Sequence, residues 1–190
     1  MNQAISGAGL FLVQAIVTLG TFAFLLRFVL QAVRADFYNP ITQAIVRLTD
    51  PLLKPARKIV PPIGGLDVAS LLIAVLFQFA LIFLLFSGIQ PATAFVLATF
   101  RLLMLVLDLF FWAMVIIVII SWVAPGNRHP GSDLLYQITE PLLGPLRRII
   151  PPMGGLDFSV MVAFLLLVMV REYLIPGIAI ELGISPSALG

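Results

Sequence analysis

Four long apolar segments, separated by shorter and more polar stretches, organise this chain. They cover residues 8–33, 68–88, 95–124 and 158–170. A helix needs about 20 residues to cross a bilayer, and the first three segments are long enough. The fourth meets Arg171 and Glu172, so we expect Arg171 to lie near a membrane interface or to extend towards one. The pattern predicts an all-α membrane protein with four transmembrane helices.

Composition supports a membrane protein over a soluble one. Hydrophobic residues make up 61% of the 190 residues and charged residues only 11%, against about 25% charged in soluble domains. The helices of a soluble bundle would carry a polar face, whereas the first three segments are apolar all round. The chain has no cysteine and one histidine, His129, so thiolate chemistry and a multi-histidine metal site are excluded. We expect no catalytic, cofactor-binding or metal-binding residues, and therefore no enzyme.

A repeated motif divides the chain into two units. Residues 49–67 read TDPLLKPARKIVPPIGGLD and residues 139–157 read TEPLLGPLRRIIPPMGGLD, with 13 of 19 positions identical. Each copy lies between two apolar segments, which predicts two repeats, residues 1–90 and 91–190. Two spans per repeat give both copies the same orientation in the membrane. The predicted architecture is therefore two parallel helix–elbow–helix repeats with amphipathic interfacial segments.

This doubled motif, P-L-L-x-P-x-R-[KR]-I-[VI]-P-P-x-G-G-L-D, resembles the YggT family of small bacterial inner-membrane proteins. The resemblance covers essentially the whole chain. It implies four spans, an inner-membrane location and no known enzymatic activity. It also implies links to osmotic and potassium homeostasis and to cell division, without a settled molecular mechanism.

The segment before and within the first motif is predicted to form an amphipathic helix from Pro40 to Val60. Asn39 is a suitable N-cap and Pro40 suits the first helical position. Pro51 and Pro55 each lack an amide donor, so we expect a bent elbow in which Asp50 caps a new turn. The side chains expected to face lipid are Leu52, Leu53 and Ile59. Those expected to face water or phosphate are Lys54, Arg57 and Lys58.

The glycine pair and the aspartate that end each motif predict a reversal and a new helix. Gly64 and Gly65 suit a backbone reversal that side chains would hinder. Asp67 and Asp157 each precede an apolar span, where a carboxylate can cap the helix and complement its dipole. The alternative is that these aspartates are ion ligands or proton carriers; we favour the caps.

Basic residues gather in the motif regions, which hold eight of the eleven Lys and Arg residues. The positive-inside rule therefore places both motif loops in the cytoplasm and both termini in the periplasm. The same charges could also bind anionic lipid headgroups or an acidic partner. The candidate binding residues are Lys54, Arg57, Lys58, Arg147 and Arg148. Nucleic acid is not expected, because the loops lack clustered aromatic residues and carry acids among the bases.

Charged residues inside apolar segments are the other candidate functional groups, since they are costly in a bilayer. They are Arg101, Asp108 and Arg171, and Arg27, which can extend to an interface. Asp108 most needs a partner. We expect an ion pair with Arg101 or Arg171; the alternative is a proton or cation site.

These features favour a non-enzymatic membrane scaffold or assembly factor that acts through basic amphipathic loops in the cell envelope, in division or in osmotic stress. The expected partners are anionic lipid headgroups, an unidentified membrane protein and a second copy of the chain. The alternative is part of a potassium channel or transporter with Asp108 and Gln78 along the path. Four spans offer few oxygens for an ion, which argues against that alternative.

Overall fold

The computed structural model describes residues 2–86, 88–124, 126, 129–151 and 157–189, with side chains from residue 7 onward. Four helical stretches are long and apolar enough to cross a membrane. The first three lie within α1 (Asn2–Ala32), α3 (Val68–Leu85) and α4 (Pro91–Val123). The fourth runs from Phe158 to Glu181. The described part of the chain contains no strand, and the predicted all-α fold with four spans is confirmed.

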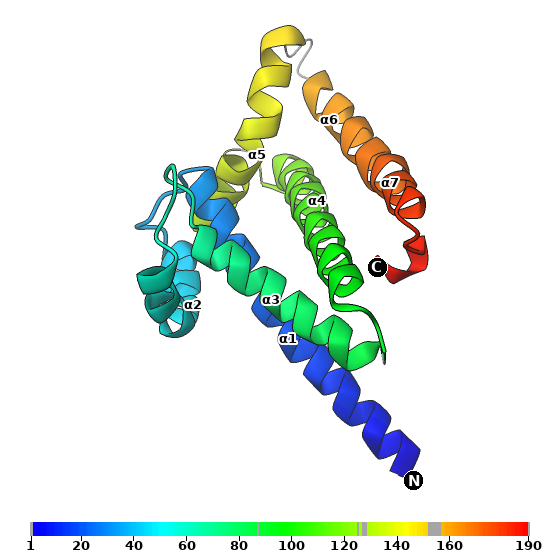
Figure 1. The fold of residues 1–190 in the computed structure, drawn as a ribbon. Helices are drawn as coiled ribbons and strands as arrows, with labels where there is room; N and C mark the ends of the chain where they lie inside the picture. Colours follow the sequence, from blue (N-terminus) through cyan, green and yellow to red (C-terminus); the bar gives the residue numbers. More distant parts are fainter. Residues whose placement is uncertain (1, 87, 125, 127–128, 152–156, 190) are drawn as a thin grey trace.

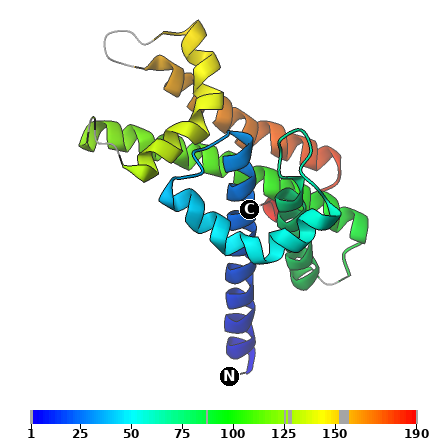
Figure 2. The same cartoon turned by 90° about the vertical axis from the view of Figure 1, so that its left-hand side faces the viewer.

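The motif helices α2 (Pro40–Ile59) and α5 (Pro130–Ile149) lie at one end of the four spans, and both termini lie at the other (Figure 1). Figure 2 shows α2 lying across α1 rather than alongside it. Each motif helix therefore sits where a span ends. This is the place expected for a helix in the headgroup layer.

Side-chain caps set the beginnings of several helices. Asn39 accepts a hydrogen bond from the Ile41 amide at the start of α2. Asp67 caps α3 by accepting from the Ser70 amide, and Asp157 caps α6 (Phe158–Met169) by accepting from the Ser159 amide. At α5 the cap is His129, whose Nδ1 accepts from the Gly131 amide while Ser132 Oγ accepts from the His129 amide. These contacts satisfy amides that have no partner within the helix itself.

One cluster of buried apolar side chains joins α1, α2, α3 and α4. Leu25 of α1 and Leu53 of α2 are fully buried in one cluster with Ala69 and Ala74 of α3. Gly20 lets α1 approach α3 closely, because a Cβ there would lie 2.7 Å from the ring of Phe77. Small residues serve the same purpose in many membrane helix pairs. The N-terminal half of α1 instead extends past its neighbours (Figure 1) and exposes Phe11, Leu12, Ile16 and Leu19.

The predicted break in the first motif helix is wrong. α2 runs continuously through Pro51 and Pro55, and α5 runs through the equivalent prolines. Asp50 does not cap a new turn, because its carboxylate contacts Arg27 and Lys54 instead. A proline costs a helix one hydrogen bond and a clash. In α2 this cost is offset by contacts with α1 and α3.

One further expectation about position is wrong. Leu53 was expected to face lipid, but it is fully buried against α1 and α3 because it lies on the inner face of α2. The fourth helical stretch does not end at Arg171. It continues through a π-helical turn, Val170–Leu174, into α7 (Ile175–Glu181), and a short 3₁₀ turn, Pro186–Ala188, follows.

Candidate functional site

α2 presents three different faces, and this division defines its chemistry. Residues that follow helical spacing share a face. One face packs inward and buries Thr42, Thr49 and Leu53. A second is apolar and exposed, with Leu48 at 71%, Leu52 at 53% and Ile59 at 83% of full exposure. A third carries the exposed amines of Lys54 and Lys58.

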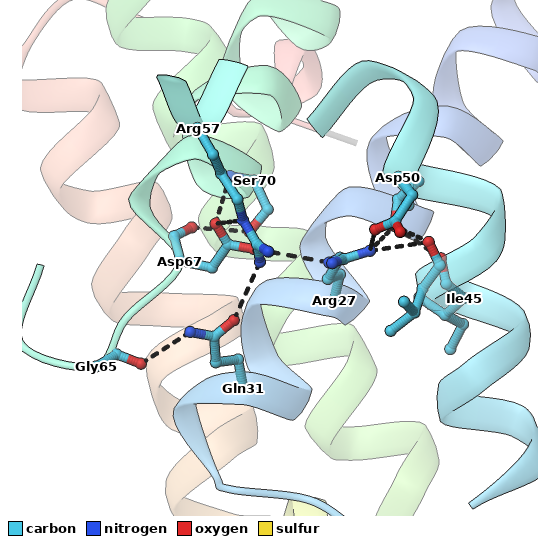
Figure 3. Close-up of polar contacts among 10 residues, drawn as sticks. Arg27, Gln31, Ile45, Asp50, Arg57, Gly65, Asp67 and Ser70 are labelled. Carbon is cyan, nitrogen blue, oxygen red and sulfur yellow. Dashed lines mark hydrogen bonds and ion pairs between the residues drawn. The ribbon is translucent and has the colours of Figure 1, made fainter. Parts of the chain in front are cut away.

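Arg27 lies at the centre of a polar network beneath α2 (Figure 3). Its side chain is only 8% exposed, because it is enclosed between α2 and the start of α3. Its guanidinium donates to the Val46 carbonyl at 2.9 Å, to Thr49 Oγ1 at 2.7 Å and to Asp50 Oδ1 at 2.8 Å. Pro51 has no amide hydrogen, so the carbonyl of Arg47 loses its usual helical donor. The Val46 carbonyl, to which Arg27 donates, is the neighbouring one in the helix. Arg27 thus supplies donors beside the proline and ties α1 to α2.

Asp67 connects this network to the start of α3. Its carboxylate is fully buried and lies 2.5 Å from Arg57 Nη2 and 3.7 Å from Arg27 Nε. Gln31 extends the network by accepting from Arg57 and donating to the Gly65 carbonyl (Figure 3). Gly64 and Gly65 both have positive φ, at 61° and 82°, as in the tight turns that glycine favours. Asp67 is therefore both a helix cap and the counter-charge of two arginines.

The second repeat has a simpler version of this network. Arg147 Nε donates to Asp157 Oδ2 at 2.9 Å, as Arg57 does to Asp67, and Arg147 also contacts Glu140. The position equivalent to Arg27 is Ile117, which is buried and apolar. The Asp157 side chain is 28% exposed, whereas that of Asp67 is fully buried. The first repeat therefore depends more heavily on buried charge.

Two aspartates of the motif regions have lowered pKa values. Burial raises the pKa of Asp50, but hydrogen bonds from Lys54 and Arg27 and their positive charges lower it below its ordinary value. Burial likewise raises the pKa of Asp157, and hydrogen bonds from Ser159 and Arg147 more than offset this effect. Both carboxylates are therefore stabilised in the ionised form by the fold.

The five candidate binding residues separate into two groups. Arg57 and Arg147 are held in ion pairs with the capping aspartates. Lys58 and Arg148 are exposed, and Lys54 is 74% exposed although it contacts Asp50. The two motif helices also differ in charge, since α2 carries four basic residues and one acidic residue while α5 carries two of each. The basic surface is concentrated on α2.

The two motif helices meet at their N-terminal ends. The side-chain amide of Asn39 donates to the Pro130 carbonyl at 2.7 Å. The Asp36 amide donates to the side chain of Gln137 at 2.8 Å. Leu134 and Ile138 of α5 also pack with Val29 and Leu30 of α1. These contacts join the two repeats into one surface at the same end of the bundle.

The charges within the spans form a second polar region. Asp108 pairs with Arg171, with Nε and Oδ1 2.6 Å apart, and Arg171 also contacts Glu172. Arg101 takes a different partner, the Ala188 carbonyl at 2.7 Å. A cavity of about 270 Å³ adjoins these groups, and its lining includes Gln14, Thr18, Gln78, Arg101 and Asp108. Gln78 is buried there, and its Oε1 has no hydrogen-bond partner among the described residues.

The network around Arg27 is what sequence reasoning missed. Nothing in the spacing of Arg27 and Asp50 along the sequence indicates a contact. The available signal was the difference between the repeats, because a polar residue that is not repeated needs a local explanation. Across the described residues, no group of three or more His, Cys, Asp or Glu side chains could hold a metal ion.

Comparison with known proteins gives consistent matches over both repeats. The CCB3/YggT family model matches residues 6–87 and 96–178. A Pseudomonas aeruginosa protein named PA0392 is 42% identical over 93% of this chain and 92% of its own length. The Escherichia coli protein named YggT is 38% identical over 85% of this chain and 86% of its own length. No solved structure matches the chain.

Proposed function

The chain belongs to the CCB3/YggT family, and from that premise we propose that it is a non-enzymatic membrane scaffold whose motif helices engage anionic lipid headgroups on the cytoplasmic side of a bacterial inner membrane. The division of α2 into apolar and basic exposed faces carries the proposal. Leu48, Leu52 and Ile59 would enter the hydrocarbon boundary. Lys54 and Lys58 would then lie among headgroup phosphates.

The arrangement of the motif helices supports this function. Because α2 and α5 lie at one end of the spans and touch each other, Lys54, Lys58 and Arg148 can act on the same leaflet. Each basic residue near an anionic surface contributes about 1 kcal/mol of attraction. Local enrichment of anionic lipid is a means by which a protein without catalytic groups can organise a membrane. Envelope assembly and the response to osmotic stress are processes that such a scaffold could serve.

A potassium path is the second candidate, and the cavity beside Gln78 is the observation that favours it. The charges around this cavity oppose a cation. Asp108 is already paired with Arg171, and Arg101 adds a positive charge that no described carboxylate balances. A cation there would meet few free oxygens to replace its hydration shell. We therefore favour the scaffold.

The test is a variant with Lys54, Lys58 and Arg148 all changed to glutamine. Arg57 and Arg147 stay unchanged, because their ion pairs hold Asp67 and Asp157. Arg34, Arg47 and Arg128 remain to hold the topology. We expect the variant to insert and remain folded while the excess of anionic over zwitterionic lipid around the protein falls markedly. The measurement is the composition of co-purified lipid after extraction in a lipid-preserving polymer.

The matched control changes three exposed polar residues away from the motif helices, Thr99, Ser121 and Ser185, to alanine. The control should keep the lipid composition of the unaltered chain. If the charge variant keeps it as well, the headgroup proposal is wrong. If the charge variant instead loses potassium flux in proteoliposomes, the transport function becomes the better one.

A further inference from the structure

A cavity of about 450 Å³ lies between the end of α1, the inner side of α2 and the turn at Gly65. Its polar lining consists of Arg27, Gln31, Arg34, Thr42 and Arg57, and no aspartate or glutamate lines it. The rest of the lining is mainly apolar and includes Leu30, Phe37, Ile45 and Val46. Three arginines thus line one part of the cavity and apolar side chains the rest. Its volume is within the range of ligand sites in proteins.

Thr42 indicates that this cavity takes a ligand. The residue is only 6% exposed, and its Oγ1 has no hydrogen-bond partner among the described residues. A buried polar group without a partner is costly and uncommon. The equivalent residue in the second repeat, Ser132, is also buried, but its hydroxyl bonds to His129. The first repeat therefore leaves a hydroxyl available where the second repeat uses it.

The charges around the cavity favour an anion. Asp50 and Asp67 lie behind the lining and offset Arg27 and Arg57. Arg34 is exposed and makes no ion pair with the residues that the structure describes, so the three lining arginines exceed Asp50 and Asp67 by one positive charge. The carbonyls at the end of α1 do not oppose an anion strongly. Those of Val29, Leu30 and Gln31 already accept from the amides of Val33, Ala35 and Arg34, respectively.

We propose that this cavity binds the phosphodiester of one anionic phospholipid. The phosphate would accept from the Thr42 hydroxyl and the Arg34 guanidinium, since arginine donors match phosphate oxygens in geometry and charge. The glycerol and the first methylene groups would lie against Leu30, Phe37 and Ile45. The inference rests on the proposed function, because it needs the end of α1 to lie in the headgroup layer. The proposed function needs an excess of anionic lipid around the protein, whereas this site needs one lipid molecule that stays bound.

A free phosphate ion shares the polar chemistry but not the apolar contacts. Inorganic phosphate would leave the exposed parts of Phe37 and Ile45 facing water, whereas a phospholipid covers them. The two sources can therefore be separated by adding each to delipidated protein. A short-chain phosphatidylglycerol should raise the temperature of unfolding. Inorganic phosphate and short-chain phosphatidylcholine should raise it much less.

The main experiment counts the phospholipid that the full chain retains through detergent washing, by native mass spectrometry. Two variants test the site, Thr42→Val, which keeps the shape of the side chain, and Arg34→Gln, whose side chain is exposed. Loss of one hydrogen bond to a charged group lowers affinity by about tenfold or more. Each variant should therefore lose most of the retained lipid. Arg47→Gln and Thr99→Val remove a charge and a hydroxyl outside the cavity and should keep it.

The outcomes separate this inference from the proposed scaffold. Retention of the lipid by both Thr42→Val and Arg34→Gln would overturn the inference, whatever happens to the surrounding lipid. Equal stabilisation by inorganic phosphate would also overturn it, because the ligand would then be a free anion. If the Lys54, Lys58 and Arg148 variant loses no anionic enrichment while Arg34→Gln loses the retained lipid, the scaffold fails and the site stands. Arg34→Gln keeps the test decisive if Thr42→Val does not fold.

Discussion

At the scale of single residues, buried charge in this protein is explained by the partner that each charge meets. Arg27 would be costly in a bilayer if it had no partner. It is stable because α2 brings Thr49, Asp50 and the Val46 carbonyl to its guanidinium. The motif helix is therefore required for the first span to carry an arginine. Ile117 needs no such partner, which explains why Glu140 is free to pair with Arg147 instead.

Asp108 and Arg171 should be coupled in stability, because their side chains lie 2.6 Å apart within the spans. Asp108→Asn and Arg171→Gln should each destabilise the protein, and the double variant should lose less than the sum. Coupling between residues in contact is about 0.5–3 kcal/mol. The measurement is the free energy of unfolding in detergent for the four proteins of the cycle. Arg101→Gln is the matched control. Its change in free energy of unfolding should add to that of Asp108→Asn without coupling, since Arg101 bonds to the Ala188 carbonyl.

At the scale of elements, the two copies of the motif have similar sequences but unequal surroundings. α5 packs Leu134 and Ile138 against its neighbours, whereas the equivalent side of α2 exposes Leu48. Asp67 faces two arginines and is fully buried, whereas Asp157 faces one and is partly exposed. A duplicated helix–elbow–helix unit thus supplies one repeat with an open basic surface and one with a bridging helix.

This inequality predicts different costs for the same substitution in the two repeats. Asp67→Asn leaves Arg27 and Arg57 with less counter-charge, and breaking a buried ion pair costs about 3–5 kcal/mol. Asp157→Asn acts on a partly exposed pair and should cost about 1 kcal/mol or less. Both asparagines can still cap their helices, so the difference isolates the charge. Equal losses in free energy of unfolding would show that burial of Asp67 has no such effect.

The sequence predicted elements better than it predicted contacts between them. The caps at Asn39 and Asp67 and the boundaries of the first three spans follow from local rules of capping and hydropathy. The continuity of α2 through Pro51 does not follow from these rules, because tertiary contacts offset the local cost of a proline inside a helix. The partner of Arg27 and the cavity beside Thr42 depend on how α2 crosses α1. That crossing leaves no trace in the periodicity of either helix.

At the scale of the whole molecule, parallel duplication places matching parts at the same end of the bundle. The fold brings α2 and α5 together at one end and both termini to the other (Figure 1). It thus fixes which segments share a side, while the positive-inside rule predicts which side that is. The basic residues of both motifs make the cytoplasm the expected side for α2 and α5.

The chain has no cysteine, so single cysteines can test this orientation directly. Gly7→Cys and Ser187→Cys report on the ends that carry the termini, and Ile63→Cys and Asp133→Cys report on the motif end; all four positions are exposed. An impermeant thiol reagent added to intact spheroplasts should label the first two variants and leave the last two unlabelled until the membrane is opened. The opposite pattern would place α2 in the periplasm, where the reagent reaches Ile63 and Asp133. Labelling of one motif position but not the other would contradict the parallel repeat itself, because α2 and α5 could not then share a leaflet.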